Sequence, residues 1–162
     1  MAEVQAWRAT QAALATEVTR VTTLLRSVNT EKRPEPVLGR WGLADIAMHL
    51  SQTWIAIPGL ARADLSEVEA IVPGRGAGPS VARDVGQLGA VTLSAVAADP
   101  ERDLGVLADR IETRSREYLA HCAEADPDLH RPWLLSGITV PPHVFTAHEL
   151  SETVVHGADI AR

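Results

Sequence analysis

The chain has 162 residues, of which 46% are hydrophobic and 22% are charged, and its formal net charge is −6. This length predicts one domain over residues 1–162, and this composition excludes a disordered, collagen-like or low-complexity chain. Because only 4% of the residues are aromatic, the core must consist mainly of Ala, Leu, Val and Ile, which favours helices over a sheet.

Charge and hydropathy argue against two classes of partner. A nucleic-acid-binding protein needs a basic stripe, and no run of basic residues is longer than the pair Lys32-Arg33. No apolar run reaches the roughly 18 to 20 residues of a membrane span, and no leader pattern is present at the N-terminus. The single cysteine, Cys122, fits a reducing compartment. We therefore expect a cytoplasmic protein whose partners are small molecules, and a homodimer is compatible with this pattern.

Helical periodicity dominates the first part of the chain. Apolar side chains at steps of three, four or seven predict an amphipathic helix over residues 2–29. Residues 30–40 are polar and contain two prolines, which predicts a connection. A second helix is predicted from about Gly42, and Pro58-Gly59 is expected to kink or end it.

The middle of the chain contains a loop and a weaker helix. Residues 72–79 are rich in Gly and Pro and predict an exposed loop. Residues 81–98 predict a helix weakened by Gly86 and Gly89, since each glycine costs about 1 kcal/mol relative to Ala. This is the extra, shorter helix of the predicted fold.

Two further long helices are predicted in the last third. The sequence Asp-Pro-Glu at 99–101 is typical of a helix start, and this helix should run to about Ala123. Residues 125–142 predict an irregular segment, and the last helix should begin at one of its final two prolines and run to the chain end. Four long helices, one shorter helix and no convincing strand predict an all-α helical bundle.

The last predicted helix carries a polar ribbon. Glu152 and His156 are four residues apart and therefore lie on one face, and His148, Glu149 and Asp159 extend that face. Two interpretations remain open at this point. The ribbon is either a solvated outer surface or one half of a site that faces the bundle interior.

The second predicted helix supplies a partner for this ribbon. His49 lies at the edge of the buried stripe, between Met48 and Leu50. A single histidine in this position is usually a hydrogen-bonded core residue. Together with a Glu/His pair on a facing helix, however, it completes a His, Glu, His set, which is typical of catalytic zinc sites that keep a coordination position open.

Two short sequence boxes resemble a known family. Residues 40–50, Arg-Trp-Gly-Leu-Ala-Asp-Ile-Ala-Met-His-Leu, resemble the "W-t-v-x-D-l-x-x-H-l" box of the DinB-like metalloproteins, specifically the mycothiol-dependent maleylpyruvate isomerase family. Residues 152–162, Glu-Thr-Val-Val-His-Gly-Ala-Asp-Ile-Ala-Arg, resemble that family's "E-x-x-V-H-G-w-D-l-A" ending. Gly42 and Ala158 depart from these patterns without touching a ligand position. The order of the boxes agrees with the family over most of the chain.

The resemblance implies an up-and-down-type four-helix bundle that holds a divalent metal, usually zinc, through His49, Glu152 and His156. It also implies a thiol-dependent isomerase or transferase that uses mycothiol or another small thiol as cosubstrate on an electrophilic small molecule. Metal coordination favours the thiolate, which is the nucleophile. Many family members continue into a second domain, so this chain is expected to be a minimal member or to lack such a part.

Other residues have weaker candidate roles. His148 or Glu149 is a candidate for moving protons, and His148 is also an alternative metal ligand. Arg75 and Arg83 flank the glycine-rich loop and could meet a carboxylate of the thiol cofactor or the substrate. Trp54 is expected to line a cavity near His49.

The alternatives to a thiol-dependent enzyme are a metalloprotease, an enzyme with a cysteine nucleophile and a non-catalytic bundle. A metalloprotease is disfavoured because Glu152 stands where an H-E-x-x-H motif needs its second histidine. Cys122 lacks a base or an oxyanion-stabilising turn nearby and is interpreted as a packing residue. The second hypothesis for the function is a non-catalytic bundle that binds a metal or a small ligand.

Overall fold

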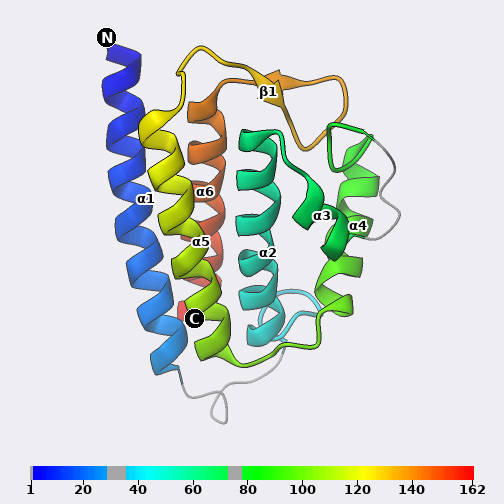
Figure 1. Ribbon diagram of the computed structural model, residues 1–162. Coiled ribbons are helices and arrows are strands. Elements are labelled where there is room, and N and C mark those ends of the chain that lie inside the picture. The colour runs from blue at the N-terminus through cyan, green and yellow to red at the C-terminus, as the bar shows by residue number, and fades with distance from the viewer. Residues whose placement is uncertain (1, 29–35, 73–77) are drawn as a thin grey trace.

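The computed structural model describes residues 2–28, 36–72 and 78–162, and most of these residues are helical (Figure 1). The elements in chain order are α1 (Ala2–Ser27), α2 (Leu43–Arg62), α3 (Ser66–Ile71), α4 (Val85–Ala98), α5 (Leu104–Glu124), β1 (Arg131–Pro132), β2 (Thr139–Val140) and α6 (Pro142–Ala161). The all-α prediction is therefore confirmed. Part of the predicted connection and most of the predicted glycine-rich loop lie outside the described residues.

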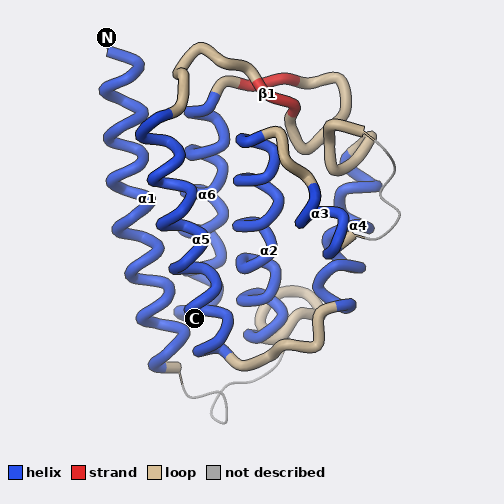
Figure 2. Tube along the Cα trace, viewed as in Figure 1, coloured by secondary structure: helices blue, strands red, loops and turns tan. Residues whose placement is uncertain are grey.

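The four longest helices lie side by side. Each of α1 and α2 packs against both α5 and α6, so the four helices enclose one core. The shorter helices α3 and α4 pack on α2, on the side away from α1 (Figures 1 and 2). The two short strands pair antiparallel and connect α5 to α6 at one end of the molecule. Helix α2 therefore lies between the other long helices and a small outer layer that consists of α3 and α4.

The core of the described residues is built mostly from aliphatic side chains, as the composition indicates, and its aromatic members are Trp7, Trp54, Tyr118 and Phe145. Its largest fully buried side chains are Trp54, Tyr118, Phe145, Leu14, Leu25, Ile46, Met48, Leu50, Ile57, Leu60, Leu107 and Ile111. A buried hydroxyl connects three helices, since Thr146 Oγ1 accepts a hydrogen bond from Trp7 Nε1 at 2.8 Å and lies 3.0 Å from the Tyr118 hydroxyl. Burying each large apolar side chain contributes about 1.5 to 3 kcal/mol.

Helix α2 continues through Pro58 and ends at Arg62, so proline does not end it. A proline inside a helix removes one backbone hydrogen bond. The neighbouring side chains of Ile57 and Leu60 are fully buried, and their burial offsets that loss. The helix ends where Ala63 adopts a left-handed conformation with φ of 57°.

Helix α4 begins four residues later than expected, at Val85. Asp84 is its N-cap and accepts a hydrogen bond from the Gln87 backbone N–H at 2.8 Å. The preceding residues Val81 and Ala82 donate their N–H groups to the Leu134 carbonyl instead. Pairing with this distant loop therefore takes the place of a helical conformation at these two residues.

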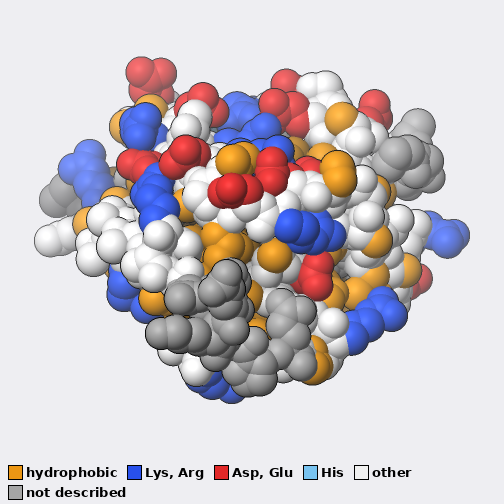
Figure 3. Space-filling model, turned by 90° about the horizontal axis from the view of Figure 1, so that it is seen from below, with side chains coloured by type: hydrophobic (Ala, Val, Ile, Leu, Met, Phe, Trp, Pro, Cys, Tyr) orange, Lys and Arg blue, Asp and Glu red, His pale blue; other side chains and the backbone are white. Residues whose placement is uncertain are grey.

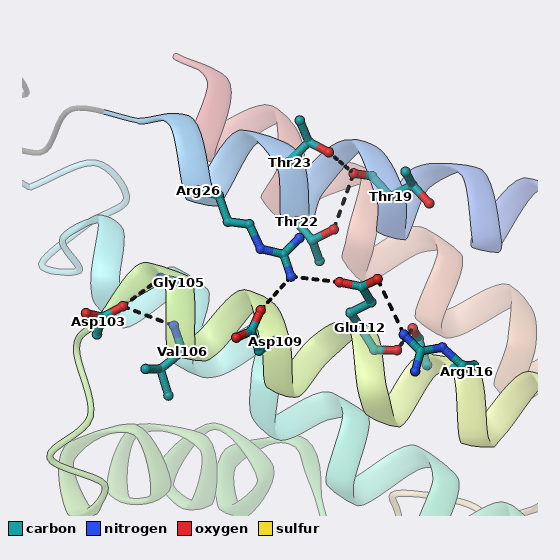
Figure 4. Close-up of polar contacts among 11 residues, drawn as sticks. Thr19, Thr22, Thr23, Arg26, Asp103, Gly105, Val106, Asp109, Glu112 and Arg116 are labelled. Atoms are coloured by element: carbon teal, nitrogen blue, oxygen red, sulfur yellow. Dashed lines mark hydrogen bonds and ion pairs between the residues drawn. The ribbon is translucent and has the colours of Figure 1, made fainter.

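Helix α5 also begins later than predicted, at Leu104 rather than near Pro100. Asp103, not Asp99, is the N-cap, and it accepts hydrogen bonds from the backbone N–H groups of Gly105 and Val106 (Figure 4). Both aspartates have the capping chemistry, so composition alone did not decide between them.

Two small elements were not predicted. Helix α3 has six residues, which is too few to show helical periodicity. Each strand of the hairpin has two residues, which is too few for an alternating pattern, and the hairpin lies within the segment that we predicted to be irregular.

The surface mixes charges of both signs. On the face shown in Figure 3, acidic and basic side chains are interspersed with apolar ones. Helices α1 and α5 are connected by such a contact, because Arg26 lies 2.6 Å from Asp109 and 2.7 Å from Glu112 (Figure 4). Among the described residues, no helix is long and apolar enough to cross a membrane.

Gly157 of α6 packs directly against α1. A Cβ atom built on Gly157 would lie 2.6 Å from Val21 Cγ2 and 2.7 Å from Arg20 Nη2. Such distances are far below van der Waals contact, and the Val21 side chain is fully buried. The position therefore requires glycine, although glycine disfavours a helix interior.

We expect Gly157→Ala to lower the free energy of unfolding by about 1 to 3 kcal/mol, because the added methyl group overpacks the α1–α6 contact. Gly89→Ala is the matched control, since nothing lies within 4 Å of a Cβ atom there, and it should be neutral or stabilising. Chemical denaturation measures both variants. Equal stability of the two variants would contradict the close packing at Gly157.

Candidate metal centre

Three side chains from two helices meet at one point. His49 lies in the first half of α2, and Glu152 and His156 lie in the second half of α6, which runs antiparallel to α2 (Figure 1). Glu152 Oε2 lies 3.2 Å from His49 Nε2 and 3.4 Å from His156 Nε2. One ligand atom from each residue lies within 4.8 Å of the other two.

These distances fit a metal site. Zinc ligands at roughly 2.1 Å in tetrahedral geometry lie about 3.4 Å from one another, close to the two Glu–His separations. Within the described parts of the chain, the group of metal-ligating side chains identified is His49, Glu152 and His156, and His148 does not belong to it. Nitrogen and carboxylate donors of this kind suit zinc, and three protein ligands leave a position open for another molecule.

The ribbon on α6 faces inward. The side chain of His156 is 11% exposed and that of Glu152 is 25% exposed, so the interpretation as a solvated outer face is wrong. The i,i+4 spacing places both ligand atoms on one side of α6, and Gly157 allows this helix to lie close to α1.

Asp159 holds His156 from behind. The Asp159 side chain is 5% exposed, and its Oδ2 atom accepts a hydrogen bond from His156 Nδ1 at 3.3 Å. Its other oxygen accepts from Arg162 Nη2 at 2.7 Å. A carboxylate only accepts hydrogen bonds, so His156 donates from Nδ1 to Asp159, and its Nε2 atom faces Glu152.

The electrostatics of the three ligands are coupled. Hydrogen bonds from His156 and His49 hold the pKa of the Glu152 carboxyl far below its usual range. Burial lowers the pKa of the His156 imidazole, but hydrogen bonds and charge interactions with Glu152 and Asp159 outweigh burial and raise it. Glu152 is therefore an ionised carboxylate, which is the form that ligates a cation.

A cavity of about 190 Å³ opens beside these residues. Its walls come from α2, α3, α4, α6 and the segments around Val81 and Leu134. The contribution of α3 and α4 to this wall was not predicted from the sequence. Helix α3 itself was not predicted, and the sequence pattern of α4 did not show which part of the molecule α4 packs against. The ring of Trp41 lies 5.2 Å from that of His49.

The other predicted site residues lie in different environments. His148 lines the cavity, and its ring lies 5.1 Å from that of Trp133. Burial is the main cause that lowers the pKa of His148. Trp54 does not line the cavity, because it is fully buried against Tyr118. Arg83 is exposed, and its Nε atom donates to the Gln87 side chain. Arg75 lies outside the described residues.

Glu149 is fully buried behind the cavity wall. Its Oε2 atom lies 3.2 Å from Thr53 Oγ1, which also lies 2.9 Å from the Leu50 carbonyl, and its Oε1 atom has no hydrogen-bond partner. Burial and the Glu152 charge raise the pKa of Glu149 well above its usual value. A neutral Glu149 can donate its proton to Thr53, whose own proton is then free for Leu50. Two carboxyl groups one turn apart on α6 therefore have opposite protonation states.

The fold and this centre define a class: a helical domain with a His/Glu/His set beside an apolar cavity. The chain belongs to the mycothiol maleylpyruvate isomerase N-terminal domain family, whose sequence model matches residues 14–161. The match includes the first sequence box and all of the second except Arg162, and the predicted family is confirmed. Searches of curated proteins and of solved structures found no match.

The neutral state of Glu149 makes folding stability depend on pH. In the folded protein this carboxyl keeps its proton above the ordinary pKa of 4.5, where the unfolded chain has released it. Stability therefore falls as pH rises above that value, by at most about 1.4 kcal/mol per pH unit. Glu149→Gln removes this dependence, so its melting temperature should exceed that of the unmodified protein by roughly 3 °C or more at pH 8.

At pH 5 this difference should be smaller. Calorimetry at both pH values with matched metal content measures it. Glu117→Gln is the control, because Glu117 is exposed on α5 and its replacement should give the same difference at both pH values. A pH-independent effect of Glu149→Gln would show that Glu149 is ionised in the folded protein.

Proposed function

We propose that the protein is a metal-dependent enzyme that uses a small thiol of the mycothiol type as cosubstrate. It either isomerises an electrophilic small molecule or transfers the thiol onto it. His49, Glu152 and His156 are the proposed ligands of a divalent metal, zinc by the chemistry of the donor set. The observation that carries this proposal is the convergence of these three side chains within 4.8 Å at the edge of a cavity. The family membership supports the choice of a thiol and a small molecule as partners.

Each side chain has a role that follows from its place. A metal held by His49, Glu152 and His156 would favour the thiolate form of the thiol, which is the reactive nucleophile. Asp159 orients His156, and His49 is held between Trp41 and Glu152. We assign proton transfer at the cavity wall to His148, because its lowered pKa keeps the imidazole neutral and able to accept a proton near pH 7. Glu149 acts behind the wall, by positioning Thr53.

We also assign the fold to the DinB-like four-helix bundles. The closed set of contacts among α1, α2, α5 and α6 supports this assignment. In such bundles, metal sites are built from side chains that project inward from facing helices, as His49 and the Glu152/His156 pair do here.

We expect His156→Ala to lose stoichiometric zinc, because two remaining protein ligands do not hold zinc tightly. His130→Ala is the control, since His130 is exposed and outside the ligand group. Elemental analysis of both purified variants gives the metal content. Full zinc in His156→Ala would overturn the ligand assignment.

Turnover should require the thiol. With zinc-loaded protein, mycothiol should raise the melting temperature, because a ligand of the native state stabilises it, and isomerase or transferase activity should disappear when the thiol is omitted. Bacillithiol and glutathione are the comparison thiols. Zinc binding with no response to any thiol would favour the alternative, a non-catalytic metal-binding bundle.

We expect Asp159→Asn to weaken zinc binding by about 10- to 100-fold, because the amide holds the His156 ring less well than a carboxylate does. Asp109→Asn is the control, as Asp109 is exposed and pairs with Arg26. Competition with a zinc chelator measures both affinities. Equal zinc affinity of the two variants would show that Asp159 has no part in holding the ligand.

A further inference from the structure

The cavity beside the candidate metal centre has two chemically different regions. One region carries the polar side chains of His49, His148 and Glu152. The rest of the wall is predominantly aliphatic and is formed by Ala56, Ile57, Val68, Ile71, Val72, Val81, Leu88, Val91, Ala95 and Leu134. A molecule in this cavity therefore presents an apolar body to the wall and its reactive part to the metal centre.

The polar side chains within the aliphatic region already have partners in the protein. The Gln52 amide donates to the Ala95 carbonyl at 2.9 Å, and the Thr92 hydroxyl donates to the Leu88 carbonyl at 3.0 Å. Thr53 Oγ1 contacts the Leu50 carbonyl and Glu149. These donors are thus engaged, and a ligand would have to compete for them.

Among the described residues, the lining of this cavity contains no lysine or arginine. A carboxylate placed against the aliphatic wall would lose its water without gaining a counter-charge, which is strongly unfavourable. Arg83 is exposed and donates to Gln87, and it does not line the cavity.

We infer that this cavity binds an uncharged, electron-poor small molecule with an apolar body, such as a neutral unsaturated ester or ketone, and excludes dicarboxylates. The inference rests on the proposed function, because it assigns the cavity to the electrophile. At about 190 Å³ the cavity is comparable to one of about 150 Å³ that accommodates benzene. A hydroxyl-rich thiol such as mycothiol does not match an aliphatic wall and keeps its polar part outside.

The chemistry is balanced for an unsaturated ester. The thiolate sulfur adds to one alkene carbon, a C–S bond forms, and the π electron pair moves onto the ester carbonyl. After rotation about the former double bond, the pair returns and expels the thiolate. No atom, proton or electron is gained or lost, so the cis ester becomes the trans ester and the thiol is regenerated.

Binding tests the inference without turnover. Dimethyl succinate and succinate form a matched unreactive pair, and calorimetric titration of the zinc-loaded protein gives both affinities. We expect the ester to bind at least about tenfold more tightly than the dianion. Succinate can also coordinate the metal directly, so only binding that depends on the cavity wall counts.

Two variants of the cavity wall identify the binding that depends on this wall. Ala56→Phe and Val91→Phe fill the cavity from α2 and from α4, and each should weaken ester binding about tenfold or more while zinc content stays unchanged. Leu93→Phe is the control on the exposed face of α4 and should leave ester binding unchanged. The inference is overturned if the ester does not bind, or if neither wall variant weakens ester binding. It is also overturned if succinate binds as tightly as the ester and both wall variants weaken succinate binding.

Turnover separates this inference from the proposed function. Dimethyl maleate and maleate are offered with mycothiol, and spontaneous isomerisation is subtracted. Turnover of dimethyl maleate but not of maleate supports both the inference and the proposed function. Cavity-dependent ester binding without turnover of either compound supports the inference and contradicts the proposed function. Turnover of maleate at a higher kcat/KM than the ester supports the proposed function and overturns the inference.

Discussion

The centre of the molecule depends on one carboxylate, Glu152, held between two imidazoles. A carboxylate that is three-quarters buried is unfavourable unless charged or hydrogen-bonding groups compensate for lost water. His49 and His156 provide that compensation, and they come from helices that run in opposite directions. The position of α2 against α6 is thus constrained by charge as well as by packing. The cavity opens beside this contact, and Asp159 accepts a hydrogen bond from one of its two histidines.

Helix α6 shows how environment divides the work of similar groups. Glu149 and Glu152 are three residues apart, yet one faces the core beside Thr53 and the other faces two histidines. The first is neutral because burial penalises its charge, and the second is ionised because its neighbours stabilise the charge. This helix therefore joins the apolar core to the candidate metal centre within a single turn.

The sequence predicted the long helices and the three candidate ligands, because both signals are local and periodic. An i,i+4 pair such as Glu152/His156 lies on one face of any helix, and His49 was recognised by its own sequence box. The predicted starts of α4 and α5 were earlier than the observed starts at Val85 and Leu104. For α4, Val81 and Ala82 pair with a distant loop, and for α5, two aspartates have the chemistry of an N-cap. The burial of Glu149 and Trp54 depends on neighbouring helices, and spacing within one helix does not reveal it.

The cavity wall and the ligand set come from partly separate elements. The ligands are carried by α2 and α6, whereas much of the wall is supplied by α3, α4 and the segment around Leu134. Packing of the four long helices constrains the candidate ligands. Helices α3 and α4, in contrast, have extensive contacts with only one of the long helices, α2. Sequence change in the outer layer can therefore alter which molecule fits without moving the ligands. The shape of the cavity is in this way separable from the position of the three candidate ligands.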